Sequence, residues 1–214
     1  FPLFPFLIAL FERILGNYVQ SALLIVHIAL FVALLLLWKL VKIDFGDTIA
    51  IWAIVFLLSF PTSFFFGGIY TESLFLMLVL GSFYAARKNR WMLASLLVGF
   101  ASATKLVGIF LLPALLFEAW EQGKFKVIKK KLRIMRKDIF WLSIVPLGLF
   151  SYMLYLQFTL GDPLAFVHVQ PAFGANRTGG EIILLPQVLF RYIKIFLTIS
   201  WIEYDFRVAV LEMF

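Results

Sequence analysis

The sequence contains no cysteine and only two histidines among its 214 residues. Without cysteine, the chain has no disulfides, no thiolate nucleophile and no cysteine-ligated metal site. The two histidines, His27 and His168, are far apart in the chain and form no H-E-x-x-H pattern. The sequence therefore predicts no zinc site and no other cofactor.

Charged residues are also scarce, since they make up only 14% of the chain, whereas 63% of it is hydrophobic. That apolar fraction is well above the usual value for a soluble domain. Apolar runs such as residues 21–37 and 139–149 lack the alternation that a membrane β-barrel requires. The composition therefore predicts an all-α, polytopic helical membrane protein. The net charge of +7 is concentrated in two inter-helix stretches, which indicates orientation in a membrane and no nucleic-acid partner.

Six membrane spans are predicted. They are residues 18–41, 48–60, 69–86, two short segments within 91–118, and 139–160. Read as one span, residues 91–118 would put the basic stretch 123–138 on the side opposite the basic residues 87–90. A turn at Lys105 instead places both stretches, and most of the 19 Lys and Arg residues, on the cytoplasmic side, as the positive-inside rule favours. The resulting helices of roughly 13 residues are shorter than the usual ~20.

With this topology, four unusual stretches emerge on the non-cytoplasmic side: residues 1–17, 60–72, 104–105 and 161–181. The stretch 60–72 belongs to the sequence FPTSFFFGGIYTES at 60–73. Pro61 ends the preceding helix there, because proline cannot supply a helical N–H and disfavours helix just before it. Glu72 begins the next helix, where the helix dipole favours a carboxylate and Thr71 could act as the cap. Alternatively, Tyr70 and Glu72 line a substrate site, because paired glycines allow a close backbone approach.

Lys105 is a single cation at a turn on the non-cytoplasmic side, where the positive-inside rule disfavours cations. Either its side chain extends to the surface, or it has an anionic partner such as a phosphate. Close to it in the sequence, Ser95, Gly99 and Ser102 share one helix face. This pattern of small residues predicts close helix packing.

Residues 187–198 predict an amphipathic helix that lies at the membrane interface. One face carries Gln187, Arg191, Lys194 and Thr198, and apolar residues including Ile183, Phe190, Ile193 and Leu197 are available to face lipid. Two cations make this segment a poor membrane span. Its basic face would meet either lipid headgroups in general or one bound phosphate.

Four motifs occur in a fixed order along the chain. They are FPLFP at 1–5, FPTSFFFGGIYTESLF at 60–75, SATKLVGIFLLPALL at 102–116 and GDPLAFVHVQ at 161–170. In this order the chain resembles the PIG-V-like family of membrane mannosyltransferases, especially its prokaryotic members. The resemblance implies a GT-C glycosyltransferase whose active site faces the extracytoplasmic side and whose donor is a polyprenyl-phosphate-linked sugar. Eukaryotic members transfer mannose onto a growing glycosylphosphatidylinositol anchor.

The polar residues of these motifs and of the basic helix face are the candidate substrate-binding residues. They are Tyr70, Glu72, Lys105, His168, Gln170, Arg191 and Lys194. Extracytoplasmic cations are suited to stabilising a phosphate leaving group. The catalytic residue itself is not identified.

In GT-C enzymes the catalytic carboxylate normally precedes the FP-x-x-P element, with which this sequence starts. We therefore expect residues 1–214 to be a fragment, truncated at both ends, of one membrane-embedded transferase domain, with the general base upstream of Phe1. Its residues 161–200 would form an extracytoplasmic loop and the interfacial helix. Neither Glu72 nor Asp162 is assigned as the base.

The function predicted from these motifs is transfer of a sugar, with mannose favoured, to a lipid-linked or extracytoplasmic acceptor. The alternative is a non-catalytic membrane protein, such as a lipid-linked-sugar transporter or an assembly subunit. The expected location is the plasma membrane in a prokaryote or the endoplasmic reticulum membrane in a eukaryote. Membrane lipid and the donor are the predicted partners.

Overall fold

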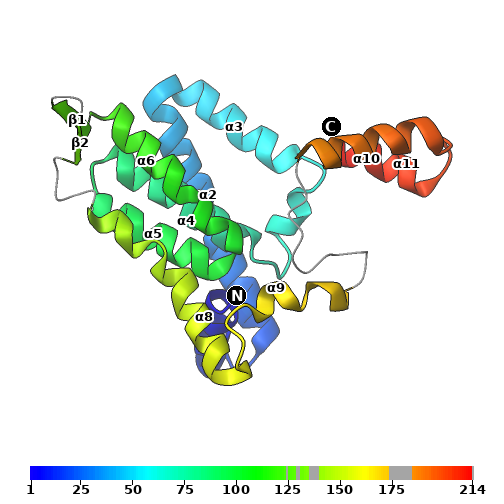
Figure 1. Ribbon diagram of the computed structural model, residues 1–214, viewed down its shortest axis with the longest axis horizontal. Helices are drawn as coiled ribbons and strands as arrows, with labels where there is room; N and C mark the ends of the chain where they lie inside the picture. The colour runs from blue at the N-terminus through cyan, green and yellow to red at the C-terminus, as the bar shows by residue number, and fades with distance from the viewer. Residues whose placement is uncertain (124, 129–130, 135–139, 174–184, 214) are drawn as a thin grey trace. The chain divides into compact units, whose positions relative to one another are not determined.

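The computed structural model describes residues 1–123, 125–128, 131–134, 140–173 and 185–213. The chain divides into two compact units, Phe1–Pro163 and Leu164–Phe214, which are described separately. Both are predominantly helical (Figure 1). The elements of the first unit are α1 (Leu3–Leu15), α2 (Tyr18–Phe45), α3 (Asp47–Ser59), η1 (Ser63–Phe66), α4 (Glu72–Arg87), α5 (Trp91–Thr104), η2 (Leu106–Phe110), α6 (Leu111–Glu121), β1 (Phe125–Ile128), β2 (Lys131–Ile134), η3 (Trp141–Ile144) and α8 (Leu147–Leu160).

Residues 1–17, which lie outside the predicted membrane spans, contain helix α1. Pro5 is tolerated because it falls in the first turn, where backbone N–H groups have no intrahelical partner. Gly16 ends the helix in the left-handed conformation, with φ 67°, and its N–H donates to Glu12 O at 2.7 Å. Asn17 then caps α2 by accepting a hydrogen bond from the backbone N–H of Gln20 at 3.0 Å.

Helix α4 is central to the first unit, because it packs between α2 and α5, while α1 and α3 pack on α2 (Figure 1). On its other side, α5 packs against η3 and α8. At this contact the hydroxyl of Ser102 is fully buried and donates to Gly99 O at 2.8 Å. Val145 O is a second acceptor for the same hydroxyl, at 3.2 Å. A Cβ atom added to Gly148 would overlap the Gly99 carbonyl and the Ser102 hydroxyl. The predicted packing role of the small residues on α5 is therefore confirmed.

The predicted turn at Lys105 is also confirmed. Helix α5 ends at Thr104, η2 follows, and α6 runs back beside α4. Near the far end of α6, the carboxylate of Glu118 pairs with Arg87 at the end of α4. A single continuous helix from Trp91 would have placed Glu118 about 40 Å away from its start. The reading of residues 91–118 as one straight span is therefore wrong.

Two helical segments among the described residues are long and apolar enough to cross a membrane, Tyr18–Phe45 and Trp141–Leu160. Helices α3 and α5 are apolar but contain only 13 and 14 residues. The count of six spans therefore stays a prediction. The described residues also depart from the predicted all-helical fold, because β1 and β2 pair antiparallel within the basic stretch. Both strands alternate apolar and polar residues in part, a pattern typical of strands.

The second unit contains α9 (Ala165–His168), η4 (Gln170–Phe173), α10 (Leu185–Thr198) and α11 (Tyr204–Met213). Helices α10 and α11 form a helical hairpin, in which the rings of Phe196 and Phe206 meet edge to face with centroids 5.4 Å apart. The predicted amphipathic helix at 187–198 corresponds to α10. Ile183, which was expected on its lipid side, lies outside the described residues.

Candidate functional site

The Lys105 ammonium pairs with the Glu72 carboxylate. Lys105 follows the last residue of α5, and its Nζ donates to Glu72 Oε1, at the start of α4, over 2.8 Å. About a third of each side chain is exposed. The ammonium also lies over the ring of Phe75, with 5.6 Å between Nζ and the ring centroid. The chain itself therefore supplies an anionic partner for the cation that the charge rule disfavours.

The second carboxylate oxygen of Glu72, Oε2, is buried and accepts no hydrogen bond from the residues that the structure describes. A buried acceptor without a partner costs roughly 1–3 kcal/mol, and more when the group is charged. Because the helix dipole favours a carboxylate at this position, α4 offsets part of that cost. Oε2 therefore keeps an unused acceptor capacity, although it is closed to solvent in this structure.

The loop that leads to Glu72 forms the predicted helix–break–helix element. Phe60 is extended after α3, η1 follows, and Ser73 Oγ donates to Phe66 O at 2.6 Å, which ties the loop to α4. The ring of Tyr70 lies edge-on to Phe65, with centroids 5.0 Å apart, and is half exposed. The expectation that Thr71 caps α4 is wrong, because Thr71 has helical backbone angles and its side chain makes no capping hydrogen bond.

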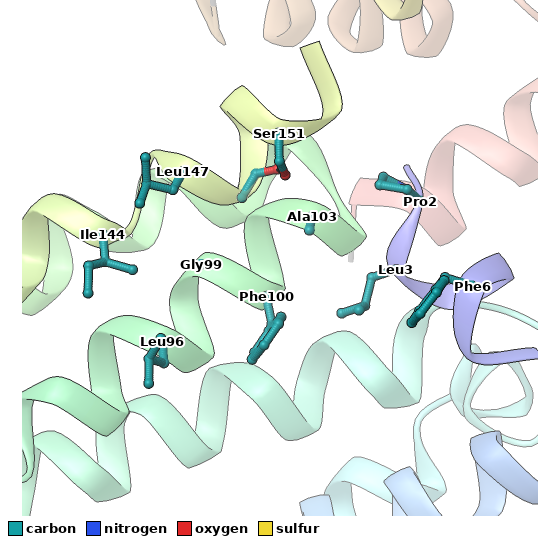
Figure 2. A pocket seen from close by; sticks show the side chains of 11 residues that line it. Pro2, Leu3, Phe6, Leu96, Gly99, Phe100, Ala103, Ile144, Leu147 and Ser151 are labelled. Carbon is teal, nitrogen blue, oxygen red and sulfur yellow. The ribbon is translucent and has the colours of Figure 1, made fainter. Parts of the chain in front are cut away.

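An apolar groove of about 390 Å³ lies between α1, α5 and the η3–α8 segment (Figure 2). Its lining residues are Pro2, Leu3, Phe6, Leu96, Gly99, Phe100, Ala103, Ile144, Leu147, Gly148 and Ser151. None of Tyr70, Glu72 and Lys105 lines this groove, although Ala103 is only two residues from Lys105 in the chain. Of these three residues, the structure brings Glu72 and Lys105 into direct contact.

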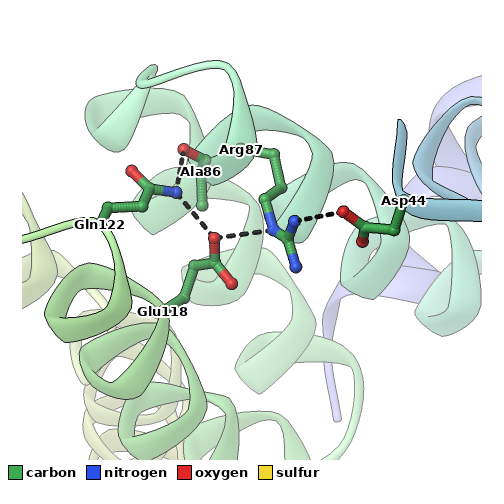
Figure 3. Close-up of polar contacts among 5 residues, drawn as sticks. All are labelled: Asp44, Ala86, Arg87, Glu118 and Gln122. Carbon is green, nitrogen blue, oxygen red and sulfur yellow. Dashed lines mark hydrogen bonds and ion pairs between the residues drawn. The ribbon is translucent and has the colours of Figure 1, made fainter.

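A second charged cluster lies at the opposite end of α4 (Figure 3). Arg87 bridges Asp44 on α2, at 2.8 Å, and Glu118 on α6, at 2.7 Å. Gln122 Nε2 donates to Glu118 Oε1 at 2.7 Å and to Ala86 O at 3.1 Å. Burial alone would lower the pKa of Arg87, but the carboxylates of Glu118 and Asp44 outweigh it and raise that pKa above its ordinary value. This cluster ties together the ends of three helices.

The Glu72–Lys105 pair and the Arg87 cluster both lie within the part of the chain that a family profile matches. The profile of the dolichyl-phosphate-mannose-protein mannosyltransferase family matches residues 2–159 of the chain. The chain belongs to this family. Its members are membrane glycosyltransferases of the mannosyltransferase type and of the GT-C class. A search of curated proteins and a search of solved structures found no match.

The remaining candidate residues of this mannosyltransferase-family chain lie in the second unit, beyond the family match. His168 is the last residue of α9, and Gln170 donates from Nε2 to Phe166 O at 2.8 Å. Arg191 and Lys194 are exposed on α10. Their roles as substrate-binding residues stay predictions.

Sequence reasoning missed the Arg87 cluster in the family-matched region. Arg87 was interpreted only as one of several cations that orient the chain in the membrane. Its partner Asp44 is 43 residues away in the sequence, and no local pattern links the two. Glu118, an acid near the end of an apolar segment, was the one available signal that a cation lies nearby.

Proposed function

We propose that this protein transfers a sugar, with mannose favoured, from a polyprenyl-phosphate donor to a lipid-linked or extracytoplasmic acceptor. The ordered motifs that resemble the PIG-V-like family, particularly its prokaryotic members, support this assignment within the broader family. A prokaryotic source would place the protein in the plasma membrane. The observation that carries the proposal is the Glu72–Lys105 pair, which lies inside the family-matched region at the end of α4 away from the Arg87 cluster.

In the proposed reaction an acceptor hydroxyl attacks the anomeric carbon of the donor sugar. The bond between that carbon and the phosphate oxygen breaks, and the leaving polyprenyl phosphate gains a negative charge. The acceptor proton passes to a carboxylate that acts as general base. The phosphate needs a fixed positive charge more than it needs an acid.

Lys105 is the proposed source of that charge. Only one of the three protons on its ammonium is used in the Glu72 hydrogen bond, so the others can point toward a phosphate. A charge-assisted hydrogen bond of this kind is worth about 1.5–3 kcal/mol. Glu72 holds the ammonium in place. Its Oε2 accepts no hydrogen bond from the described residues and is proposed to accept one from a hydroxyl of the donor sugar when the side chains that bury it move aside. Tyr70, His168 and Gln170 are proposed as further substrate contacts.

Donor binding by the Lys105→Ala variant tests this assignment. The reconstituted protein should lose at least tenfold in affinity for a polyprenyl-phosphate sugar. The matched control is Lys88→Ala, which removes an exposed cation from the other end of α4 and should leave donor affinity unchanged.

Removing Lys105 also breaks an ion pair, so a charge swap separates the two effects. The double variant Glu72→Lys with Lys105→Glu retains opposite charges at the same two positions. The folded state of this double variant is less stable by up to ~1 kcal/mol, because a cation then lies at the N-terminus of α4. If the cation binds phosphate from position 105, the swapped protein folds but does not recover donor binding. Recovery of normal binding and turnover would show that the pair is structural and would refute the proposed role.

A further inference from the structure

Helix α10 presents three distinct faces. At 3.6 residues per turn, its partly buried face carries Phe196 and packs on α11 (Figure 1). About a third of a turn away lies an exposed apolar face. A further third of a turn away lies the polar face with Arg191 and Lys194. The packing on α11 thus accounts for only one of the two apolar sides of this helix.

The exposed apolar face is large for a surface in contact with water. It consists of Leu189 (44% exposed), Phe190 (66%), Ile193 (51%) and Leu197 (80%). In the turn between α10 and α11, two more large apolar side chains are exposed, Trp201 (74%) and Ile202 (66%). A contiguous apolar surface rimmed by polar residues marks a site of contact with a protein or a membrane.

The charge next to this patch favours a membrane. Helix α10 contains two cations and no acidic residue. Among the residues that the structure describes, neither Arg191 nor Lys194 forms a salt bridge. Cations that flank an apolar face suit the phosphates of lipid headgroups, and tryptophan is enriched at the same depth.

The length and the place of the helix in the chain agree with this reading. With 14 residues, α10 is about 21 Å long, and unlike the equally short α3 and α5 it carries two cations, which disfavours a span through a hydrocarbon core of about 30 Å. The second unit begins at Leu164, four residues after α8, which ends one of the two segments able to cross the membrane. A short covalent connection therefore links the second unit to a membrane-spanning helix.

We infer that the α10–α11 hairpin lies on one bilayer surface and contacts its phospholipids. The patch formed by Leu189, Phe190, Ile193, Leu197, Trp201 and Ile202 inserts among the upper acyl chains. Arg191 and Lys194 then reach the headgroup phosphates. Glu203, in the same turn, must stay in water and so limits the depth of insertion to about 5–10 Å. This inference does not depend on the proposed sugar transfer.

Because the chain has no cysteine, single cysteines can carry an environment-sensitive fluorophore without background labelling. The full chain would be reconstituted into vesicles of phosphatidylcholine with or without phosphatidylglycerol. The label would be placed by Ile193→Cys on the apolar face and by Gln187→Cys on the polar face. Quenchers attached at a shallow or a deep acyl position report depth. We expect the label at 193 to be quenched most by the shallow quencher, and the label at 187 to be quenched little by either.

The lipid dependence of the quenching tests the role of the cations. Phosphatidylglycerol should raise the ratio of inserted to free label by about fivefold for each cation. The double variant Arg191→Gln with Lys194→Gln should lose this rise while retaining quenching in neutral vesicles.

No quenching at position 193 would mean that protein covers the patch. Equal quenching at both positions by the deep quencher would indicate a spanning helix. A rise that needs only trace polyprenyl phosphate would indicate one specific phosphate site. Each of these outcomes overturns the inference.

Discussion

Replacing Gly148 by alanine tests the closest helix contact in the first unit. In an isolated helix the change stabilises by up to ~1 kcal/mol, because alanine is the better helix former. In the folded protein the new Cβ overlaps the carbonyl oxygen of Gly99, which is backbone and cannot rotate away. Helix α8 must therefore move away from α5. Overpacking of this kind costs about 1–3 kcal/mol, and the shift also weakens the contact between Ser102 Oγ and Val145 O, worth about 1 kcal/mol.

We therefore expect Gly148→Ala to lower the free energy of unfolding by about 2 kcal/mol. For a chain of this size, that loss lowers the midpoint of thermal unfolding by about 4–8 °C, as followed by tryptophan fluorescence in detergent or nanodiscs. The matched control is Gly99→Ala on the facing helix. Its Cβ would meet only Ile144 O at 3.7 Å, an ordinary contact, so this variant should be neutral or more stable. Adding Ser102→Ala to Gly148→Ala should not restore stability, because the overlap with the Gly99 carbonyl remains. A Gly148→Ala midpoint at or above that of the unmodified protein would refute the close packing.

Two further changes test the charged groups. Arg87→Ala should lower the free energy of unfolding by about 1–3 kcal/mol, because it leaves the largely buried carboxylate of Glu118 without its cation. The loss is not larger because the arginine side chain is partly exposed and solvent screens the pair. In a double-mutant cycle with Glu118→Gln, the two losses of unfolding free energy should not add, and additive losses would contradict the ion pair. The control variant Lys88→Ala should have nearly the stability of the unmodified protein. Glu72→Gln should leave the thermal midpoint nearly unchanged but reduce turnover, because an amide holds Lys105 less firmly and is a poorer acceptor. Full turnover of that variant would return Glu72 to the role of a helix-end residue.

The sequence predicted the local breaks of this fold better than its long-range contacts. Pro61 and Lys105 mark real interruptions, because proline cannot supply a helical N–H and an uncompensated cation is costly within lipid. The partner of Lys105 was not predicted, since Glu72 lies 33 residues earlier and the pair forms only when α4 and α5 pack together. The spacing of small residues on one helix face also predicted Ser102 as a packing residue. It could not predict the approach of Gly148, which depends on how two helices cross.

The topology of α4 provides the last prediction, on which the proposed position of Lys105 depends. Glu72 and Arg87 are the first and last residues of α4, so the two charged groups lie on opposite sides of the membrane if α4 crosses it. Thr62 and Lys88 are exposed near these two ends and can each be replaced by cysteine in the cysteine-free chain.

In sealed, right-side-out membrane vesicles, an impermeant maleimide should label Thr62→Cys directly and Lys88→Cys only after permeabilisation. Val26→Cys is the matched control, because Val26 is completely buried between helices and its cysteine should react only after denaturation. The 16 residues of α4 span only about 24 Å, so crossing requires a locally thinned bilayer or polar helix ends within the headgroup region. Labelling of both cysteines from the outside would mean that α4 does not cross. In that case the Glu72–Lys105 pair and the basic stretches would share one side, and the charge-based argument for a phosphate at Lys105 would fail.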